Sequence, residues 1–189
     1  MNNKVVLLSG VHGVGKSFFV QSRLSGIKNL NICSASQLIY QYKDREKIGY
    51  KLVSDVSANQ DILLMAIKYY QNQNPGNILL DGHICLLNNK SEVERVPLEF
   101  FLGVPISAII LLQDTVPAIK LRQCQRDNIS MDHKLIKLLQ SEEEDYCSFL
   151  RKEYSIPYIK ISPSDSKEKV LEIIDCLTGK EYNDCFGQY

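Results

Sequence analysis

The feature that most constrains this chain is a glycine-rich motif, Gly-Val-His-Gly-Val-Gly-Lys-Ser, at residues 10–17. It matches the pattern G-x-x-x-x-G-K-S of a phosphate-binding P-loop. The short apolar run at residues 4–9 predicts a buried strand directly before it. Residues 17–24 predict a helix directly after it. Strand, glycine loop and helix in this order are the context that the motif requires, so the sequence predicts a P-loop fold.

The motif also predicts how a nucleotide would be held. We expect the backbone N–H groups of residues 13–16 to surround the β-phosphate at the positive end of the helix. Lys16 would reach the β- and γ-phosphates, and the Ser17 hydroxyl would bind Mg²⁺. His12 either donates to a phosphate or only fills a variable position. The predicted nucleotide-binding residues are Gly10, His12, Gly13, Val14, Gly15, Lys16, Ser17 and Phe18.

Composition narrows the class of protein. The 189 residues suit one domain, and 44% of them are hydrophobic, which is enough for a sizeable core. The 22 basic and 22 acidic residues balance, which argues against a nucleic-acid partner. No apolar run reaches the length of a membrane span, and the first strand begins too early for a signal peptide. The six cysteines form no C-x-x-C pair, so we expect reduced thiols in a cytoplasmic protein.

Strand-like and helix-like segments alternate along the chain. Their alternation predicts an α/β three-layer sandwich, in which helices cover both faces of a five-stranded parallel sheet. We expect a single domain over residues 1–178, followed by a polar tail at 179–189. After the first strand, the expected strands are 29–33, 77–81, 106–112 and 156–161; the later helices are one starting at 34, then 59–70, 115–126, 132–152 and 165–177.

Polar residues follow the expected strands, where ligands bind in such sheets. Asp81 ends an apolar strand, so its carboxylate is a candidate for holding Mg²⁺ together with Ser17; the alternative is a cap of the next turn. His83 either contacts an acceptor substrate or makes a structural hydrogen bond. Residues 142–145 are an acidic run, expected to be a solvated helix face with one or two acids turned inward.

Two arginines, Arg122 and Arg126, lie four residues apart on one expected helix. Together with Lys16 they are the predicted catalytic residues, because guanidinium groups can neutralise the charge that spreads over a transferred phosphoryl group. In the alternative interpretation they occupy a solvated helix face, where Arg126 pairs with Asp127.

These residues resemble the nucleoside monophosphate kinase family, and above all the archaeal-type adenylate kinases and their small bacterial relatives. The resemblance implies a sheet of order 2-3-1-4-5, ATP and Mg²⁺ as cofactors, and a nucleotide-like small molecule as acceptor. By position, residues 34–70 resemble the acceptor segment, and residues 122–133 a short LID that closes over the phosphates. Residues 162–165 resemble the loop that contacts adenine. The implied binding residues are Ser36, Arg45 and His83 for the acceptor and Ser164 for ATP.

Two departures from that family leave a second hypothesis open. No arginine follows Arg126 in the expected LID, and residues 36–39 lack the arginine that the family places there. The first hypothesis is an ATP-dependent kinase that phosphorylates a nucleotide or nucleoside-like acceptor. The second is a nucleotide-binding switch, or accessory ATPase, that controls a partner protein.

Overall fold

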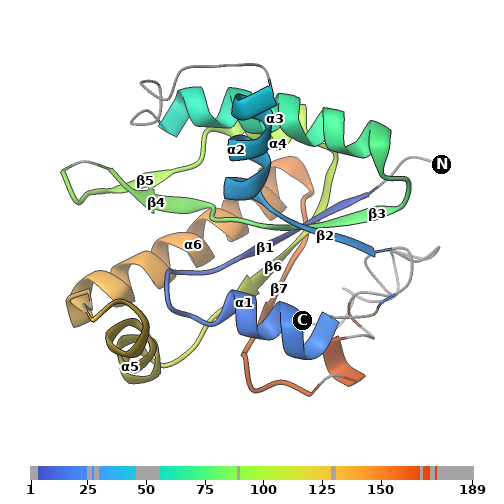
Figure 1. Cartoon of the computed structure of the whole chain (residues 1–189). Helices are drawn as coiled ribbons and strands as arrows, with labels where there is room; N and C mark the ends of the chain where they lie inside the picture. Colours follow the sequence, from blue (N-terminus) through green and yellow to red (C-terminus); the bar gives the residue numbers. More distant parts are fainter. Residues whose placement is uncertain are drawn as a thin grey trace.

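The centre of the molecule is a five-stranded parallel sheet, shown in Figure 1. The computed structural model describes residues 4–24, 27, 30–45, 56–88, 90–128, 131–166, 168–170 and 173. The strand order is β2-β3-β1-β6-β7. Counted along the chain within this sheet, that is 2-3-1-4-5, so the predicted fold class is confirmed. The strands are β1 (Val5–Ser9), β2 (Leu30–Ser34), β3 (Asn77–Asp81), β6 (Ile106–Leu112) and β7 (Tyr158–Ile161).

Strand β1 occupies the middle of the sheet and is buried along its whole length. Its side chains alternate between two hydrophobic clusters: Val5 and Leu7 face one, and Val6 and Leu8 face the other. A strand covered on both faces must be apolar throughout, which explains why this run shows no polar alternation. The strand therefore fixes the P-loop, which follows it directly, at the centre of the sheet's carboxyl edge.

Helices cover both faces of the sheet (Figure 1). Helices α2, α3 and α4 pack with one hydrophobic cluster, α1 and α5 pack with the other, and the long α6 contributes to both. Asp132 caps α6 by accepting a hydrogen bond from the Lys134 amide. The helices are α1 (Lys16–Phe19), α2 (Ala35–Arg45), α3 (Val56–Gln73), α4 (Leu98–Gly103), α5 (Val116–Asp127) and α6 (His133–Tyr154).

The structure adds elements that the sequence did not predict. An antiparallel hairpin, β4 (Cys85–Leu87) with β5 (Val93–Arg95), leads into α4. Strands of three residues are too short to show a period, so the pattern misses them. The helix expected over 17–24 is α1 followed by a π-helical turn, η1 (Val20–Leu24). Most of the helix expected at 165–177, and the tail at 179–189, lie outside the described residues.

No helix in the described part of the chain is both long and apolar enough to cross a membrane. The cysteines described there (Cys33, Cys85, Cys124 and Cys147) carry free thiols.

Candidate functional site

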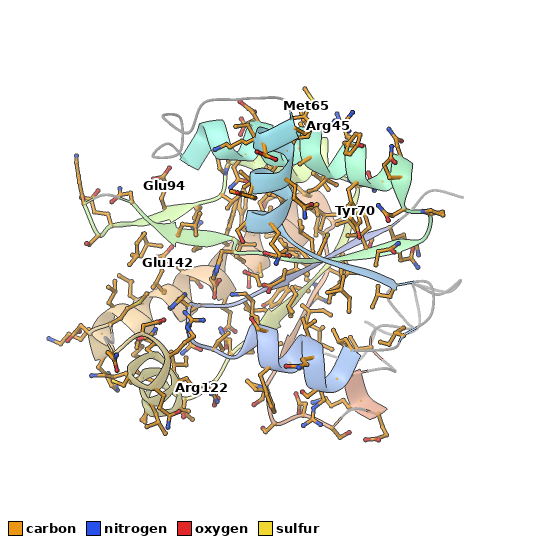
Figure 2. The ribbon with its side chains drawn as sticks, in the orientation of Figure 1. Arg45, Met65, Tyr70, Glu94, Arg122 and Glu142 are labelled. Atoms are coloured by element: carbon orange, nitrogen blue, oxygen red, sulfur yellow. The ribbon has the colours of Figure 1, made fainter. Side chains whose placement is uncertain are left out.

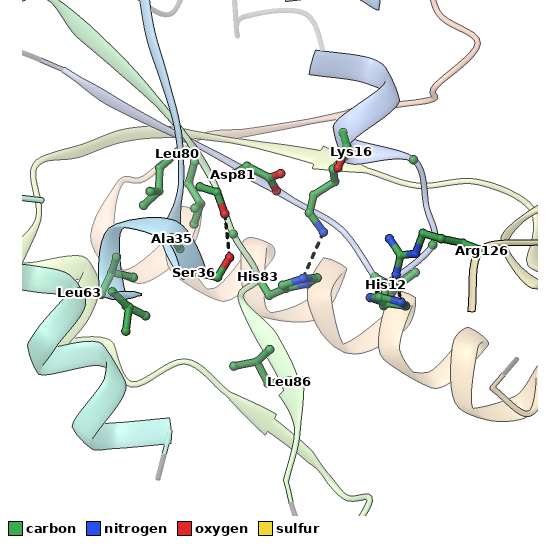
Figure 3. A pocket seen from close by; sticks show the side chains of 18 of the residues that line it. His12, Lys16, Ala35, Ser36, Leu63, Leu80, Asp81, His83, Leu86 and Arg126 are labelled. Carbon is green, nitrogen blue, oxygen red and sulfur yellow. Dashed lines mark hydrogen bonds between the residues drawn. The ribbon is translucent and has the colours of Figure 1, made fainter. Parts of the chain in front are cut away.

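A cavity of about 690 Å³ opens at the carboxyl ends of β1, β2 and β3, the edge at which parallel sheets bind ligands. The P-loop forms one wall, and the first turn of α2 forms another. Figure 3 shows Lys16 and Arg126 at one end, Leu63 and Leu86 at the other, and Asp81 between them. The cavity thus joins the phosphate loop to an apolar chamber.

The glycines of the P-loop are required by geometry. Gly13 and Gly15 have φ angles of 85° and 107°, in the left-handed region that disfavours side chains. A Cβ at Gly13 would lie 2.6 Å from Cγ of Gln123, and a Cβ at Gly10 would lie 2.5 Å from the carbonyl oxygen of Leu112. Neither space can hold a methyl group. The loop is therefore pressed against α5 and β6, and its inner face stays open to the cavity.

Lys16 is held inside this loop by two acceptors (Figure 3). Its Nζ lies 2.7 Å from the carbonyl oxygen of Gly10 and 3.2 Å from Nε2 of His83. Burial lowers the pKa of Lys16, whereas the carboxylates of Asp81 and Glu143 raise it. Burial and the nearby ammonium lower the pKa of His83 to about 3, so its imidazole is neutral at pH 7 and accepts from Lys16. The lysine is thus positioned before any ligand arrives.

Ser17 and Asp81, the residues predicted to hold a metal, both line the cavity. Burial raises the pKa of Asp81, and the positive charge of Lys16 lowers it. Hydroxyl and carboxylate oxygens are ligands that Mg²⁺ accepts in proteins, and a site with one carboxylate is completed by substrate phosphates. The glycine cradle, the buried ammonium and this oxygen pair fit a nucleotide phosphate with its Mg²⁺.

Arg122, on α5, connects the P-loop to the residue segment after β6 through hydrogen bonds. Its Nη1 donates to the carbonyl oxygen of Val14 at 2.9 Å, and its Nη2 donates to the carboxylate of Asp114. Asp114 follows the end of β6, so a single guanidinium connects the loop, the sheet and α5. The Arg122 side chain, 37% exposed, also lines the cavity. It can therefore shape the loop and face a bound phosphate.

Arg126 lies one turn further along α5, at the rim of the cavity, and is 56% exposed. It donates from Nε to Asp127 at 2.9 Å and contacts the His12 ring. Hydrogen bonds from Arg126 and His12 lower the pKa of Asp127 to about 2. The sequence thus placed both arginines near the P-loop, but Arg126 is also engaged with its neighbour, as the alternative interpretation expected.

Five predicted site residues do not line the cavity: Gly10 and Val14, which belong to the P-loop itself, and Phe18, Arg45 and Ser164. Arg45 lies at the far end of α2, where its guanidinium stacks 3.8 Å from the centre of the Tyr69 ring, away from Arg122 (Figure 2). Phe18 is 63% exposed to solvent on α1. Ser164 hydrogen-bonds the hydroxyl of Ser162 in a turn beside Gly15. Of the predicted acceptor residues, Ser36 and His83 do line the cavity.

Two buried polar residues lie behind the loop: sequence analysis missed Gln123, whereas Glu143 is an acid of the 142–145 run that was expected to have one or two acids turned inward. Gln123 is 2% exposed and donates from Nε2 to the carbonyl oxygen of His12 at 2.7 Å. Glu143 is fully buried and accepts from the Ser9 hydroxyl at 3.1 Å. The helical spacing indicates that Glu143 is buried, because this residue shares the apolar face of α6 with Leu139 and Leu150.

We expect Glu143 to make stability depend on pH. Burial raises its pKa from 4.5 to about 7, so between these values the folded state binds more protons than the unfolded state. Stability should then fall as pH rises through this window, by roughly 3 kcal/mol at most. Denaturant unfolding from pH 4.5 to 8 measures it, and Glu143→Gln should flatten the slope. The control is Glu142→Gln, which alters a partly exposed carboxylate bonded to Arg95. Equal slopes in the wild type and in Glu143→Gln would contradict the expectation.

Strand, glycine cradle, inward lysine and sheet order define a P-loop nucleotide-binding fold. Comparison with known families agrees: the AAA_17 model, an AAA domain, matches residues 9–137, and the chain belongs to that family. A search of curated proteins found no match. Solved structures that resemble most of the chain include the following two. A gluconokinase from Sinorhizobium meliloti 1021 is 14% identical with a TM-score of 0.50, covering 89% of this chain and 87% of its own. The tunicamycin resistance protein of Deinococcus radiodurans is 13% identical with a TM-score of 0.60, covering 95% and 98%. At these identities the likeness shows the fold alone.

Proposed function

We propose that this protein is an ATP- and Mg²⁺-dependent kinase that transfers a phosphoryl group to a nucleotide or nucleoside-like small molecule. The observation that carries the proposal is the single cavity that joins the P-loop to a second chamber. Its volume of about 690 Å³ lies within the range of pockets that hold small ligands. A protein that only hydrolyses ATP has no need of that second chamber. One of the two solved structures that share the fold is a gluconokinase, which is consistent with this proposal.

Each residue of the site has a separate role in the proposed reaction. The P-loop amides hold the donor phosphates, and Lys16 stabilises charge on the β- and γ-phosphates. Arg122 and Arg126 neutralise charge that spreads over the transferred group. Ser17 and Asp81 hold Mg²⁺, which supplies further neutralisation between the phosphates. Positioning and electrostatics supply most of the rate, because phosphoryl transfer needs little covalent help from the protein.

The test is acceptor-stimulated ADP formation. Purified protein with ATP and Mg²⁺ is offered nucleosides, nucleoside monophosphates and sugars, and ADP release is followed for each. A kinase should respond at least tenfold to one of these classes, and the phosphorylated acceptor should be detected by mass spectrometry. Slow hydrolysis that no compound stimulates would contradict the proposal.

Asp81→Asn keeps the shape of the side chain but removes its negative charge. We expect reduced turnover and a higher Mg²⁺ concentration at half-maximal rate, because the metal loses its carboxylate. ATP binding in EDTA should change little, since it needs no metal contact. Turnover, Mg²⁺ titration and calorimetry give the three readouts. Asp145→Asn, an exposed change on α6, is the control. A wild-type Mg²⁺ titration in Asp81→Asn would make Asp81 only a cap.

A second candidate is a nucleotide-binding switch that controls a partner protein. The observation in its favour is that few cationic side chains in the LID-like segment could close over the bound phosphates. Among the described residues that follow Arg126 in the LID-like segment, up to His133, none is a lysine or an arginine. Arg126 itself is bonded to Asp127. A switch would hydrolyse ATP slowly whatever small molecule is added, which the acceptor assay distinguishes.

A further inference from the structure

The cavity has two ends of different chemistry. The donor end, formed by the P-loop and α5, carries Lys16, Arg122 and Arg126. The acceptor end, formed by α2, α3, α4 and β4, is lined by Ala35, Ile39, Gln60, Leu63, Leu86 and Phe100. Figure 3 shows Ala35, Leu63 and Leu86 grouped on the side away from Lys16. The two ends meet at Asp81 and His83.

Among the described residues, the cationic side chains that line this cavity lie at its donor end. In the part of the chain that the structure describes, no lysine or arginine lines the acceptor end. A phosphate monoester buried there would lack a cation to replace its hydration, which is costly in apolar surroundings. Ser34 ends β2 and Ser36 lies in the first turn of α2; their hydroxyls hydrogen-bond each other at 2.9 Å, which leaves one hydroxyl proton to donate to a ligand.

The acceptor end also holds an unused hydrogen-bond acceptor. Oε1 of Gln60, on α3, is buried and has no hydrogen-bond partner among the described residues. A buried polar atom without a partner costs free energy, and a ligand that donates to it recovers that cost. The Gln60 side chain lines the cavity, so a rotation of its amide would bring Oε1 to a ligand that presents an N–H or O–H group beside an apolar body.

We infer that the phosphoryl acceptor is an uncharged, ring-bearing alcohol of the nucleoside class, with an N–H or O–H donor for Gln60, and not a nucleoside monophosphate. The inference rests on the proposed kinase function and specifies its substrate. In the step, the acceptor hydroxyl oxygen bonds to the γ-phosphorus as the bond from that phosphorus to the β–γ bridging oxygen breaks. ADP leaves with that electron pair, and the hydroxyl proton passes to water.

Matched pairs of acceptors test the inference. Five nucleosides and their 5′-monophosphates are compared by kcat/KM for ADP formation, and by the shift in Tm that each compound produces without ATP. We expect one nucleoside to exceed its own monophosphate at least a hundredfold in kcat/KM and to give the larger Tm shift. A preferred monophosphate would overturn the inference and leave the kinase proposal standing. No stimulation by either series would overturn the inference, and the absence of stimulation by sugars as well would overturn the kinase proposal.

A substitution at Gln60 tests the contact itself. Gln60→Leu should raise the KM of the preferred nucleoside at least tenfold and leave the KM of ATP unchanged, because only the acceptor reaches α3. Gln73→Leu is the matched control, an exposed glutamine at the end of the same helix. If Gln60→Leu binds the nucleoside as the wild type does, Gln60 makes no contact with it and this part of the inference fails.

Discussion

Replacing Lys16 with alanine should lower turnover at least a hundredfold. The ammonium is buried, already oriented by Gly10 and His83, and in reach of the β- and γ-phosphates in the proposed complex. Its loss should remove about 3 kcal/mol of transition-state stabilisation. The measurement is the rate of ADP formation at saturating ATP and acceptor.

Two controls accompany this variant. Circular dichroism and Tm should show that Lys16→Ala still folds. Lys137→Ala, an exposed change on α6, should have wild-type turnover. A folded Lys16→Ala protein with wild-type turnover would contradict a catalytic P-loop and every role proposed around it.

Arg122→Lys should have the second-largest effect. The change keeps the positive charge but loses the planar fork that bonds Val14 and Asp114 together. We expect turnover to fall at least tenfold, with ADP affinity much less affected, because ADP lacks the γ-phosphate. Steady-state kinetics and ADP calorimetry are the readouts. An equal loss of ADP affinity and turnover would place Arg122 on the α- or β-phosphate.

Arg126→Lys is the matched comparison on the same helix face. Its guanidinium is largely exposed and bonded to its neighbour Asp127, and such pairs contribute only about 0.2–1 kcal/mol. We therefore expect a smaller loss than in Arg122→Lys. A loss as large as that of Arg122→Lys would show that Arg126 also acts on the transferred group. Wild-type turnover in both variants would favour the nucleotide switch.

The sequence predicted those parts of the fold that depend on the pattern of residues close together in the chain. The run at β1 and the motif at residues 10–17 are contiguous, so strand, loop and helix follow from spacing alone. The remaining strands are apolar runs that alternate with helical patterns, and the handedness of parallel connections limits their arrangement. The resemblance to nucleoside monophosphate kinases supplied the strand order, which the structure confirms.

The parts that the sequence missed depend on contacts between distant elements. Arg45 follows Ser36 by only nine residues, yet along a helix this is roughly 13 Å, enough to carry it out of the cavity. Glu143 belongs to an acidic run, and only the packing of α6 behind the P-loop selects it for burial. Gln60 lines the cavity because α3 forms one wall of a chamber whose other walls are α2, α4 and β4.

The central position of β1 has a consequence for how this chain folds as it is synthesised. The strand precedes the other strands of its sheet in the sequence, yet its two neighbours are β3 and β6, which end at Asp81 and Leu112. Both pairings are parallel and span long stretches of chain, and such non-local contacts slow folding. This buried strand can therefore complete its pairing only after more than half of the chain has been synthesised. A nascent chain halted before β6 would expose one unpaired edge of β1. Such an edge is a binding site for chaperones, so we expect chaperones to bind chains stalled at this point.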